Sequence, residues 1–514
     1  MSPASSLTHL RLASFARRIL ASVIVAAPLC ATSCVTSAFA AEPDFAAISA
    51  YIDAQRAQER IPGLAVAIVG SDGTVYLAGF GLADGQGKPV ASNTPFILGS
   101  TSKSFTALAV MQLVEAGRID LDAPVQRYLP WFAVADIQAS SRITVRHLLN
   151  QTSGLSTASG RATLTDFSSG DDALENRVRA LRTVELTAPV GETYQYSNCN
   201  YQILGLIVQQ VTGQSYEAYM AEHVFGPLGM SRTDTSKDAA LRNGLAMGHR
   251  TWFGRPVAFD ETLPRASVPQ GFIISTAQDM SHYLIAQLNG GLYGDANVLS
   301  PNGIAELHRG AAREGTSDDY YAMGWNAGSR DGLKALWHSG DTNGYQSFMV
   351  LLPDAGWAFA ILSNVNNIPA NTRFEEIGWG VAQLLTGGAP KTEHVHDASW
   401  IYAVFAGIVA VQLTGIARTL VLLRRWRRDP STRPVRPTTT LSRLALPSLL
   451  NLVWGLLIFV WLPMRFAPVR ILTWAVPDIG HLLLISGVIA LAWSAIRAAL
   501  VHRTLHADAP VTAS

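Results

Sequence analysis

The chain contains 514 residues, of which 48% are hydrophobic and 15% are charged, and its formal net charge is +1. A chain of this length is too long for one hydrophobic core, so we expect a main domain of several hundred residues and a further region. The balanced charge gives no reason to expect a nucleic-acid partner. The low charged fraction and the positive mean hydropathy of +0.19 indicate that part of the chain lies in lipid.

The N-terminus has the three parts of a secretory signal peptide. Three arginines precede an apolar run over residues 19–31, and the small-residue sequence Ala38-Phe39-Ala40 follows. We therefore expect a signal peptide over residues 1–40 that is cleaved after this sequence. The alternatives are an uncleaved membrane anchor, for which the apolar run is short, and a lipoprotein anchored at Cys34. Cleavage leaves Cys199 as the single cysteine, so we expect no disulfide.

The following segment predicts one helix and then strands. A helical pattern covers residues 45–56, and the sequence "GLAVAIVGSDGTVYLAGFG" contains two strand-like runs around Ser71-Asp72-Gly73, a typical hairpin turn. Much later, "ALWHSG", "YQSFMVLLPD" and "WAFAILSN" are again strand-like, with a turn over residues 353–356. The sequence between the two groups of strands is mostly helical. We therefore expect an α+β fold in which both ends of the domain form one antiparallel sheet, flanked by helices, with an inserted helical subdomain.

The stretch "ILGSTSKSF" places Ser100 and Lys103 three residues apart. They lie at the start of a predicted helix over residues 101–116 that ends at Gly117, and on a helix this spacing lets the two side chains meet. A lysine amine takes the proton of a serine hydroxyl only if burial lowers its pKa, and a helix N-terminus stabilises an oxyanion. The alternative is an ordinary helix cap. Of the five lysines in the chain, only Lys103 follows a serine at this spacing.

Two further motifs accompany this pair. The sequence "GETYQYSNCNYQILG" contains the single Y-x-N of the chain, Tyr196-Ser197-Asn198, before an apolar helical run; its alternative role is to order a loop. The sequence "LWHSGDTNGY" puts His338-Ser339-Gly340 at the end of a strand, where glycine lets a substrate backbone approach. A second H-x-G sequence, His308-Arg309-Gly310, lies in a helical pattern and is set aside. Cys199 is interpreted as a small packed residue.

Three apolar stretches make up the C-terminal part of the chain. They cover about residues 400–423, 444–464 and 479–496, and each is long enough to cross a bilayer as a helix. The loop between the first two, residues 424–443, contains seven arginines and one aspartate. The positive-inside rule places this loop in the cytoplasm and residues 41–399 outside, in agreement with the signal peptide. The alternatives are buried core helices and, for the arginines alone, a nucleic-acid patch.

Taken in order, S-x-x-K, Y-x-N and H-x-G resemble the motifs of the serine beta-lactamase and penicillin-binding-protein superfamily, specifically its class C-like branch. The stretches "ITVRHLLNQTSGL", "PQGFIISTAQDMSHYL" and "YAMGWNAG" are similar to family segments around the active site. The resemblance covers about residues 44–390. We accordingly expect a beta-lactamase-related domain over residues 41–390, a linker over residues 391–399 and a membrane region over residues 400–514.

The resemblance implies the catalytic residues. Ser100 would be the acylated nucleophile, and Lys103 and Tyr196 would share the proton transfers, with the choice between them as base left open. The usual Thr-His of the family before "TSGL" is here Asn150-Gln151, which changes a nearby loop. The sequence contains no metal-ligand spacing and no arrangement like the deacylating glutamate of class A enzymes, so we expect neither a metal nor another cofactor.

The resemblance also implies the substrate-binding residues. Asn198 would hold the substrate amide, and His338 would face the substrate carboxylate. The backbone N–H groups of Ser100 and Asp341 would form the oxyanion hole, with Ser339 and Gly340 on the same strand. Class C beta-lactamases usually carry lysine at the first position of this third motif, whereas histidine there is similar to some D,D-carboxypeptidases and D-aminopeptidases.

Together these features predict a membrane-anchored serine hydrolase that forms an acyl-enzyme on Ser100. Its expected substrates are D-amino-acid peptides of the cell wall or related amides and esters, on the periplasmic side of the bacterial inner membrane. The alternatives are a class C-like beta-lactamase, an esterase, and a penicillin-sensing receptor without turnover. The expected partners are a small-molecule or peptidoglycan-peptide substrate and membrane lipid, without nucleic acid. The acyl group and the leaving group depend on the shape of the groove and do not follow from the sequence.

Overall fold

The computed structural model describes residues 43–163, 166–366, 371–391, 399–432, 445–465 and 469–506. The predicted signal peptide and residues 392–398 of the predicted linker lie outside these described residues. The domain over residues 43–391 and the apolar helices over residues 399–506 are described separately below.

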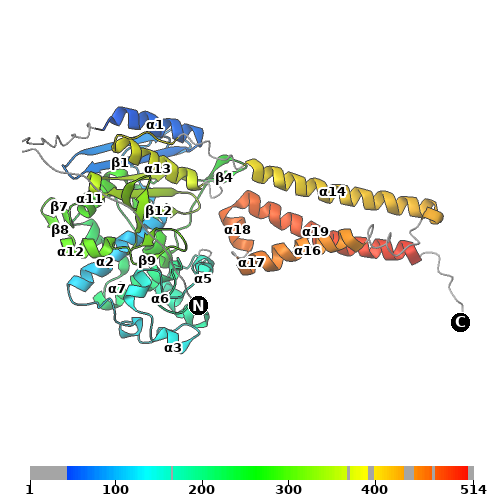
Figure 1. Ribbon diagram of the computed structural model, residues 1–514, viewed down its shortest axis with the longest axis horizontal. Coiled ribbons are helices and arrows are strands. Elements are labelled where there is room, and N and C mark those ends of the chain that lie inside the picture. The colour runs from blue at the N-terminus through cyan, green and yellow to red at the C-terminus, as the bar shows by residue number, and fades with distance from the viewer. Residues whose placement is uncertain are drawn as a thin grey trace, which may run out of the picture. The chain divides into compact units, whose positions relative to one another are not determined.

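An eight-stranded antiparallel sheet with the order β2-β1-β14-β13-β12-β11-β10-β9 is the centre of the domain (Figure 1). Strands from the two ends of the domain pair with each other, since β1 lies beside β14 with Ala67 opposite Ala360. The predicted α+β fold with an antiparallel sheet is therefore confirmed. The strands are β1 (Gly63–Gly70), β2 (Val75–Gly81), β9 (Ala312–Arg313), β10 (Tyr320–Tyr321), β11 (Asn326–Arg330), β12 (Leu333–Asp341), β13 (Gln346–Leu352) and β14 (Trp357–Ser363).

Short turns join these strands at the predicted places. Between β1 and β2, Gly73 has a φ of +92°, and the Asp72 carboxylate accepts a hydrogen bond of 2.9 Å from the Thr74 N–H. A left-handed backbone at this position favours glycine because glycine has no Cβ. The turn between β13 and β14 ends at Gly356, whose φ is +69°. Both hairpin predictions are confirmed.

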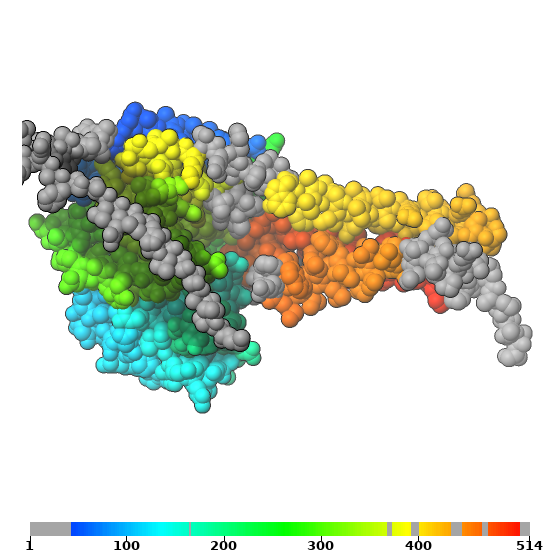
Figure 2. All heavy atoms as spheres, viewed as in Figure 1, coloured from blue at the N-terminus to red at the C-terminus, as the bar shows by residue number. Residues whose placement is uncertain are grey.

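Alternate residues of the sheet pack against helices on opposite faces. Helices α1 and α13 cover the face on which Trp337 is buried, and α2 and α11 cover the face on which Leu336 is buried. Figure 2 shows α1, in blue, close to α13, in yellow, and these two helices are in contact. Both ends of the domain therefore share one face. The four helices are α1 (Phe45–Gln58), α2 (Ser102–Glu115), α11 (Ala277–Leu288) and α13 (Asn371–Leu385).

The chain between the two groups of strands is mostly helical, as predicted, and small sheets accompany these helices. α12 ends at His308, so the second H-x-G sequence lies at a helix end. The remaining helices are α3 (Ile137–Ser140), α4 (Val145–Leu149), α5 (Thr157–Ala162), α6 (Ala173–Arg179), α7 (Asn198–Thr212), α8 (Tyr216–Met220), α9 (Lys237–Arg242), α10 (Val268–Gly271) and α12 (Pro301–His308). The remaining strands are β3 (Phe96–Ile97), β4 (Gly248–Trp252), β5 (Arg255–Phe259), β6 (Ile274–Ser275), β7 (Leu292–Tyr293), β8 (Ala296–Asn297) and β15 (Val365–Asn366).

Within the described residues, three C-terminal helical segments are long and apolar enough to cross a membrane. α14 and α19 extend beyond the predicted ends at residues 423 and 496, because helical hydrogen bonding continues into the polar sequence that follows each apolar stretch. The short helix α18 was not predicted. The elements are α14 (Ser399–Arg428), α16 (Leu446–Leu456) continued by η11 (Leu457–Trp461) and α17 (Leu462–Arg465), α18 (Val469–Ala475) and α19 (Pro477–His506).

Candidate active site

Ser100 lies in a short 3₁₀ turn, η1 (Gly99–Thr101), that leads directly into α2. The sequence predicts the helix from residue 101, and the regular α-helix begins one residue later, at Ser102. Gly99 has a φ of +59°, and a Cβ at this position would lie 2.4 Å from the backbone nitrogen of Asp341. Only glycine therefore permits the start of α2 to approach the end of β12 this closely.

Lys103 is fully buried, with 0% of its surface exposed. Its Nζ lies 3.0 Å from the Ser100 Oγ, 2.9 Å from the Asn198 Oδ1 and 2.7 Å from the Gln270 carbonyl oxygen. Among the described residues, no carboxylate lies within ion-pair distance of this amine. Burial holds the pKa of Lys103 well below its ordinary value, because a buried ammonium loses its hydration. A lysine in this state is able to accept a proton.

Tyr196 completes a compact group around the serine. The Lys103 Nζ lies 4.8 Å from the centre of the Tyr196 ring, and the Ser100 side chain lies close enough to the Tyr196 hydroxyl to act against the rise in the phenol pKa that burial causes. Burial raises the pKa of Tyr196, so the phenol keeps its proton at neutral pH. Asn198, the first residue of α7, lies two positions further along the chain and faces the lysine. The structure thus brings together the predicted S-x-x-K and Y-x-N residues.

The third motif lies on the free edge of β12, beyond the residues that pair with β11. His338 is 4% exposed; its Nδ1 lies 2.6 Å from the Ser339 carbonyl oxygen and its Nε2 lies 3.4 Å from the Tyr321 hydroxyl. Burial, and then the nearby Lys103, lower the pKa of His338 to about 3. The imidazole is therefore neutral at physiological pH. A protonated imidazole would attract a substrate carboxylate by its charge, whereas this neutral imidazole does not.

Gly340 and the Asp341 backbone lie against the start of α2. A Cβ on Gly340 would lie 2.0 Å from the Leu98 carbonyl oxygen and 3.0 Å from the Ser100 nitrogen. The two backbone segments predicted to form the oxyanion hole are therefore in contact, and their role in catalysis stays a prediction. Ser339 alternates with His338 along β12 and lies on the opposite face of the sheet, close to Glu375 of α13. Any substrate contact of Ser339 must accordingly come from its main chain.

Two contacts of the site do not follow from sequence motifs. The first is the carbonyl of Gln270, which accepts a hydrogen bond from Lys103 through its main chain, so its side chain carries no signal. Gln270 lies, however, in the stretch that begins "PQGF", which is similar to a family segment around the active site. The second is Tyr321, the first residue of the "YAMGWNAG" stretch, whose ring centroid lies 6.1 Å from those of Tyr196 and of His338. The described residues contain no cluster of histidine, cysteine, aspartate or glutamate able to hold a metal.

Gln151 holds the loop that carries Tyr196. It is fully buried with a φ of +60°, a left-handed conformation that is uncommon for a residue with a Cβ. Its backbone carbonyl accepts a hydrogen bond of 2.8 Å from the Gln195 N–H, and its Oε1 accepts one of 2.9 Å from the Ser197 N–H. The Asn200 Nδ2 donates a further bond to the same Oε1. Both chain neighbours of Tyr196 are therefore bonded to this one glutamine.

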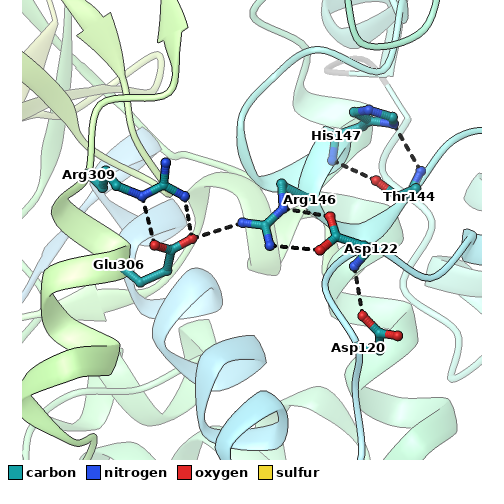
Figure 3. A network of polar contacts seen from close by, with 7 residues as sticks. All are labelled: Asp120, Asp122, Thr144, Arg146, His147, Glu306 and Arg309. Atoms are coloured by element: carbon teal, nitrogen blue, oxygen red, sulfur yellow. Dashed lines mark hydrogen bonds and ion pairs between the residues drawn. The ribbon is translucent and has the colours of Figure 1, made fainter.

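A polar network fixes α4, the helix that precedes Gln151 (Figure 3). Arg146 forms two hydrogen bonds with Asp122, of 2.7 and 2.9 Å, and one of 2.8 Å with Glu306 of α12. At the same N-terminal end of the helix, Thr144 and His147 form a reciprocal capping box. The network joins α4 to the loop that contains Asp122 and to α12, which contains Glu306. It therefore fixes the position of α4 and of Gln151, which follows this helix.

Comparisons with known proteins agree with this geometry. The family model described as Beta-lactamase matches residues 48–377, more than half of the chain, and the chain belongs to this family. It is 35% identical to "Penicillin-binding protein 4" of Amycolatopsis lactamdurans over 321 residues, which make up 61% of this chain and 83% of that protein. It is 30% identical to "Protein flp" of Staphylococcus aureus (strain MW2) over 322 residues, which make up only 60% of each protein.

A solved structure gives the same result for the fold. The chain resembles the octameric penicillin-binding protein homologue from Pyrococcus abyssi with a TM-score of 0.59 and 26% sequence identity, over 68% of this chain and 79% of that one. The predicted superfamily and fold class are therefore confirmed. The class C-like branch is compatible with these comparisons.

Proposed function

We propose that this protein is a membrane-anchored serine hydrolase that forms an acyl-enzyme on Ser100. The observation that carries the proposal is the contact of 3.0 Å between the Ser100 hydroxyl and the fully buried amine of Lys103, whose pKa is held below its ordinary value. The amine of a lysine buried beside a serine does not need its positive charge to hold the structure together. Without that charge it has the properties of a base. Membership of the Beta-lactamase family supports the same chemistry.

The proposed reaction has two steps. In the first, the neutral amine of Lys103 accepts the Ser100 proton while Oγ attacks the substrate carbonyl, and the backbone N–H groups of Ser100 and Asp341 stabilise the oxyanion. The phenol of Tyr196 transfers a proton to the leaving group as the bond to the carbonyl carbon breaks. In the second step, a water molecule loses a proton to the Tyr196 oxygen and attacks the ester carbonyl. The bond between the carbonyl carbon and Ser100 Oγ then breaks, the acid is released, and the ammonium of Lys103 returns a proton to the Oγ.

We infer that the substrates are D-amino-acid peptides of the cell wall or related amides and esters, processed on the periplasmic side of the inner membrane. D,D-carboxypeptidase and D-aminopeptidase activities are the leading forms of this proposal. The neutral state of His338 favours substrates that present no carboxylate to this strand, so an ester hydrolase is a second candidate. The apolar C-terminal helices support the membrane anchoring, with the arginine-rich loop in the cytoplasm.

The most informative test is a panel of substrates presented to the full chain in detergent. Peptides with D-alanine at the C-terminus, peptides with a free N-terminal D-residue, short-chain esters and a chromogenic beta-lactam should be compared, with Ser100→Ala as the background for each. We expect turnover of at least one of the first three classes and slow or no release of the beta-lactam product. Covalent labelling without turnover of any class would support the receptor alternative instead.

The state of His338 predicts the pH dependence of substrate binding. Because its pKa is about 3, the imidazole stays neutral from about pH 5 to about pH 9, and KM for a carboxylate-terminated D-peptide should show no step near pH 6.5. An unfolded histidine takes up its proton near pH 6.5, so this residue should lower stability as the pH falls below that value. Initial rates across this pH range measure KM. A rise in KM centred near pH 6.5, absent from His338→Gln, would show that a charged imidazole binds the carboxylate.

Gln151 is a positioning residue in this account, and its replacement should reduce turnover. Gln151→Met keeps the length of the side chain but accepts no hydrogen bond from the Ser197 N–H, so Tyr196 loses one of its two anchors. We expect kcat to fall about 10-fold to 100-fold with KM changed less than about threefold. Gln287→Met is the matched control, because Gln287 is 2% exposed and bonds His308 instead. If both variants lost stability and activity in parallel, the role of Gln151 would be merely structural.

A further inference from the structure

Two arginines line a cavity between the apolar helices. The cavity has a volume of about 400 Å³, and Arg418 of α14 and Arg497 of α19 contribute to its wall. The hydroxyl-bearing residues Thr414 and Thr419, together with Gly415, line it from α14. Basic side chains are rare and costly at such positions, and those that occur mark sites that bind an ion, a substrate or a lipid headgroup.

The helices around the cavity pack directly against each other. The Gln412 Nε2 of α14 donates a hydrogen bond of 2.9 Å to the Ser486 carbonyl oxygen of α19. The Trp454 Nε1 of α16 donates one of 3.2 Å to the Ser486 hydroxyl. Near the far end of α14, Leu423 and Trp426 are buried against α19. Hydrogen bonds and apolar contacts thus define the cavity on both sides.

The cavity is strongly positive. Arg497 is only 3% exposed, whereas Arg418 is exposed at the mouth. None of the described residues that line the cavity is acidic. In the described part of α14, α16 and α19 the single acidic residue is Asp478, which accepts a hydrogen bond from the Tyr402 hydroxyl, and Asp429, which directly follows α14, accepts one from the Ser431 hydroxyl. Two guanidinium groups that face one small volume repel each other in a medium of low dielectric, and an anion between them removes this repulsion.

The position of the two arginines along their helices indicates which leaflet they face. Arg418 lies about 27 Å along α14 from Trp400, and Arg497 lies about 30 Å along α19 from Pro477, at 1.5 Å per residue. Both values are close to the thickness of the hydrocarbon core. The two arginines therefore reach the same membrane surface, the one next to the arginine-rich loop. In the orientation proposed above, that surface is cytoplasmic.

We propose that this cavity binds the phosphate group of an anionic phospholipid from the cytoplasmic leaflet. A guanidinium recognises phosphate through two parallel N–H donors, and the exposed hydroxyl of Thr414 adds a further donor, whereas the Thr419 hydroxyl donates to the Gly415 carbonyl oxygen. A lipid is the favoured source of the phosphate, because the cavity opens onto an apolar surface where Val411, one of its lining residues, is 73% exposed. Acyl chains fit such a surface, and a free phosphate ion does not. The proposal rests on the membrane orientation and is independent of the catalytic proposal.

The test uses the full chain in a neutral detergent, titrated with short-chain phosphatidylglycerol and, separately, with phosphatidylcholine. Bound lipid is counted by native mass spectrometry, and the unfolding temperature is followed in parallel. We expect phosphatidylglycerol to bind and to raise the unfolding temperature, and phosphatidylcholine and inorganic phosphate to have little effect. Arg418→Gln with Arg497→Gln should weaken phosphatidylglycerol binding at least about fivefold. If the substitution of the buried Arg497 disturbs folding, Arg418→Gln alone tests the site, because Arg418 lies at its exposed mouth. This single variant should also weaken phosphatidylglycerol binding.

Arg424→Gln with Arg425→Gln is the matched control, because it removes the same charge from the end of α14 outside the cavity. This control should change binding less than about twofold. If both double variants lost phosphatidylglycerol binding to the same extent, the lipid would be held by general attraction to a basic surface and not by this cavity. Equal binding of the two lipids, or an effect of inorganic phosphate as large as that of phosphatidylglycerol, would overturn the lipid assignment.

Discussion

Ser100→Ala is expected to lower kcat/KM by a factor of at least about 10⁴ for every substrate that the wild-type protein turns over. Removal of the hydroxyl leaves no atom to form the ester, and the remaining groups provide only binding and oxyanion stabilisation. Ser100 is partly exposed at the start of α2, so the loss of one oxygen should change the unfolding temperature little. Steady-state kinetics and thermal unfolding of the two proteins measure these effects.

Ser102→Ala provides the matched control for this experiment. Ser102 lies two residues away and is fully buried, and its Oγ accepts a hydrogen bond of 3.1 Å from the Ile273 N–H. Its removal should cost about 1 kcal/mol of stability and less than about tenfold in kcat/KM. Turnover by Ser100→Ala close to that of Ser102→Ala would mean that another group is the nucleophile.

Lys103→Arg and Lys103→Met are both expected to lower kcat/KM by at least about 10³-fold. Arginine keeps the positive charge but cannot release its proton at usable pH, and methionine has no basic group. If arginine restored a large share of turnover, the lysine would act as a fixed charge and the proton would take another route. Single-turnover rates of acylation distinguish the two cases, since they exclude effects on product release.

Lys103→Met should also change how the stability of the protein depends on pH. The pKa of the buried lysine is lowered in the folded protein, so the unfolded chain binds a proton that the folded chain does not. Stability therefore falls as the pH decreases below the ordinary lysine value, and this cost disappears when the amine is replaced. We expect the unfolding temperature of Lys103→Met, measured by calorimetry, to rise relative to that of the wild type as the pH falls from about 10 to about 7. The loss of the hydrogen bonds to Asn198 and Gln270 affects the variant at every pH, so a difference that does not change with pH would argue against a neutral, desolvated lysine.

The sequence contains enough information for the sheet and for the main catalytic group. Hairpin turns at Gly73 and Gly356 depend on local turn chemistry, and alternation of apolar residues defines the two faces of the sheet. The S-x-x-K pair meets because its spacing is that of one helical turn, which is a local property. The contact between this pair and Asn198 required the family resemblance, since 95 residues separate Lys103 from that asparagine.

The features that the sequence does not reveal depend on packing between distant segments. The neutral state of His338 arises from its burial near Lys103, and no sequence motif reports the burial of a strand residue at an edge. The hydrogen bonds of Gln151 to both neighbours of Tyr196 join segments that are more than forty residues apart. The alternation of side chains along β12, by contrast, follows from strand geometry, which places Ser339 and His338 on opposite faces of the sheet.

The central claim is that Ser100 forms a covalent acyl-enzyme, and the most direct test is the mass of the protein after reaction with a slow acylating agent. A beta-lactam and a fluorophosphonate should each be incubated with the full chain in detergent, and the adduct should be located by peptide mapping. Our account predicts one adduct per chain, on the peptide that contains Ser100, and none on Ser100→Ala. An adduct on any other residue, or an equal yield from Ser100→Ala, would contradict it.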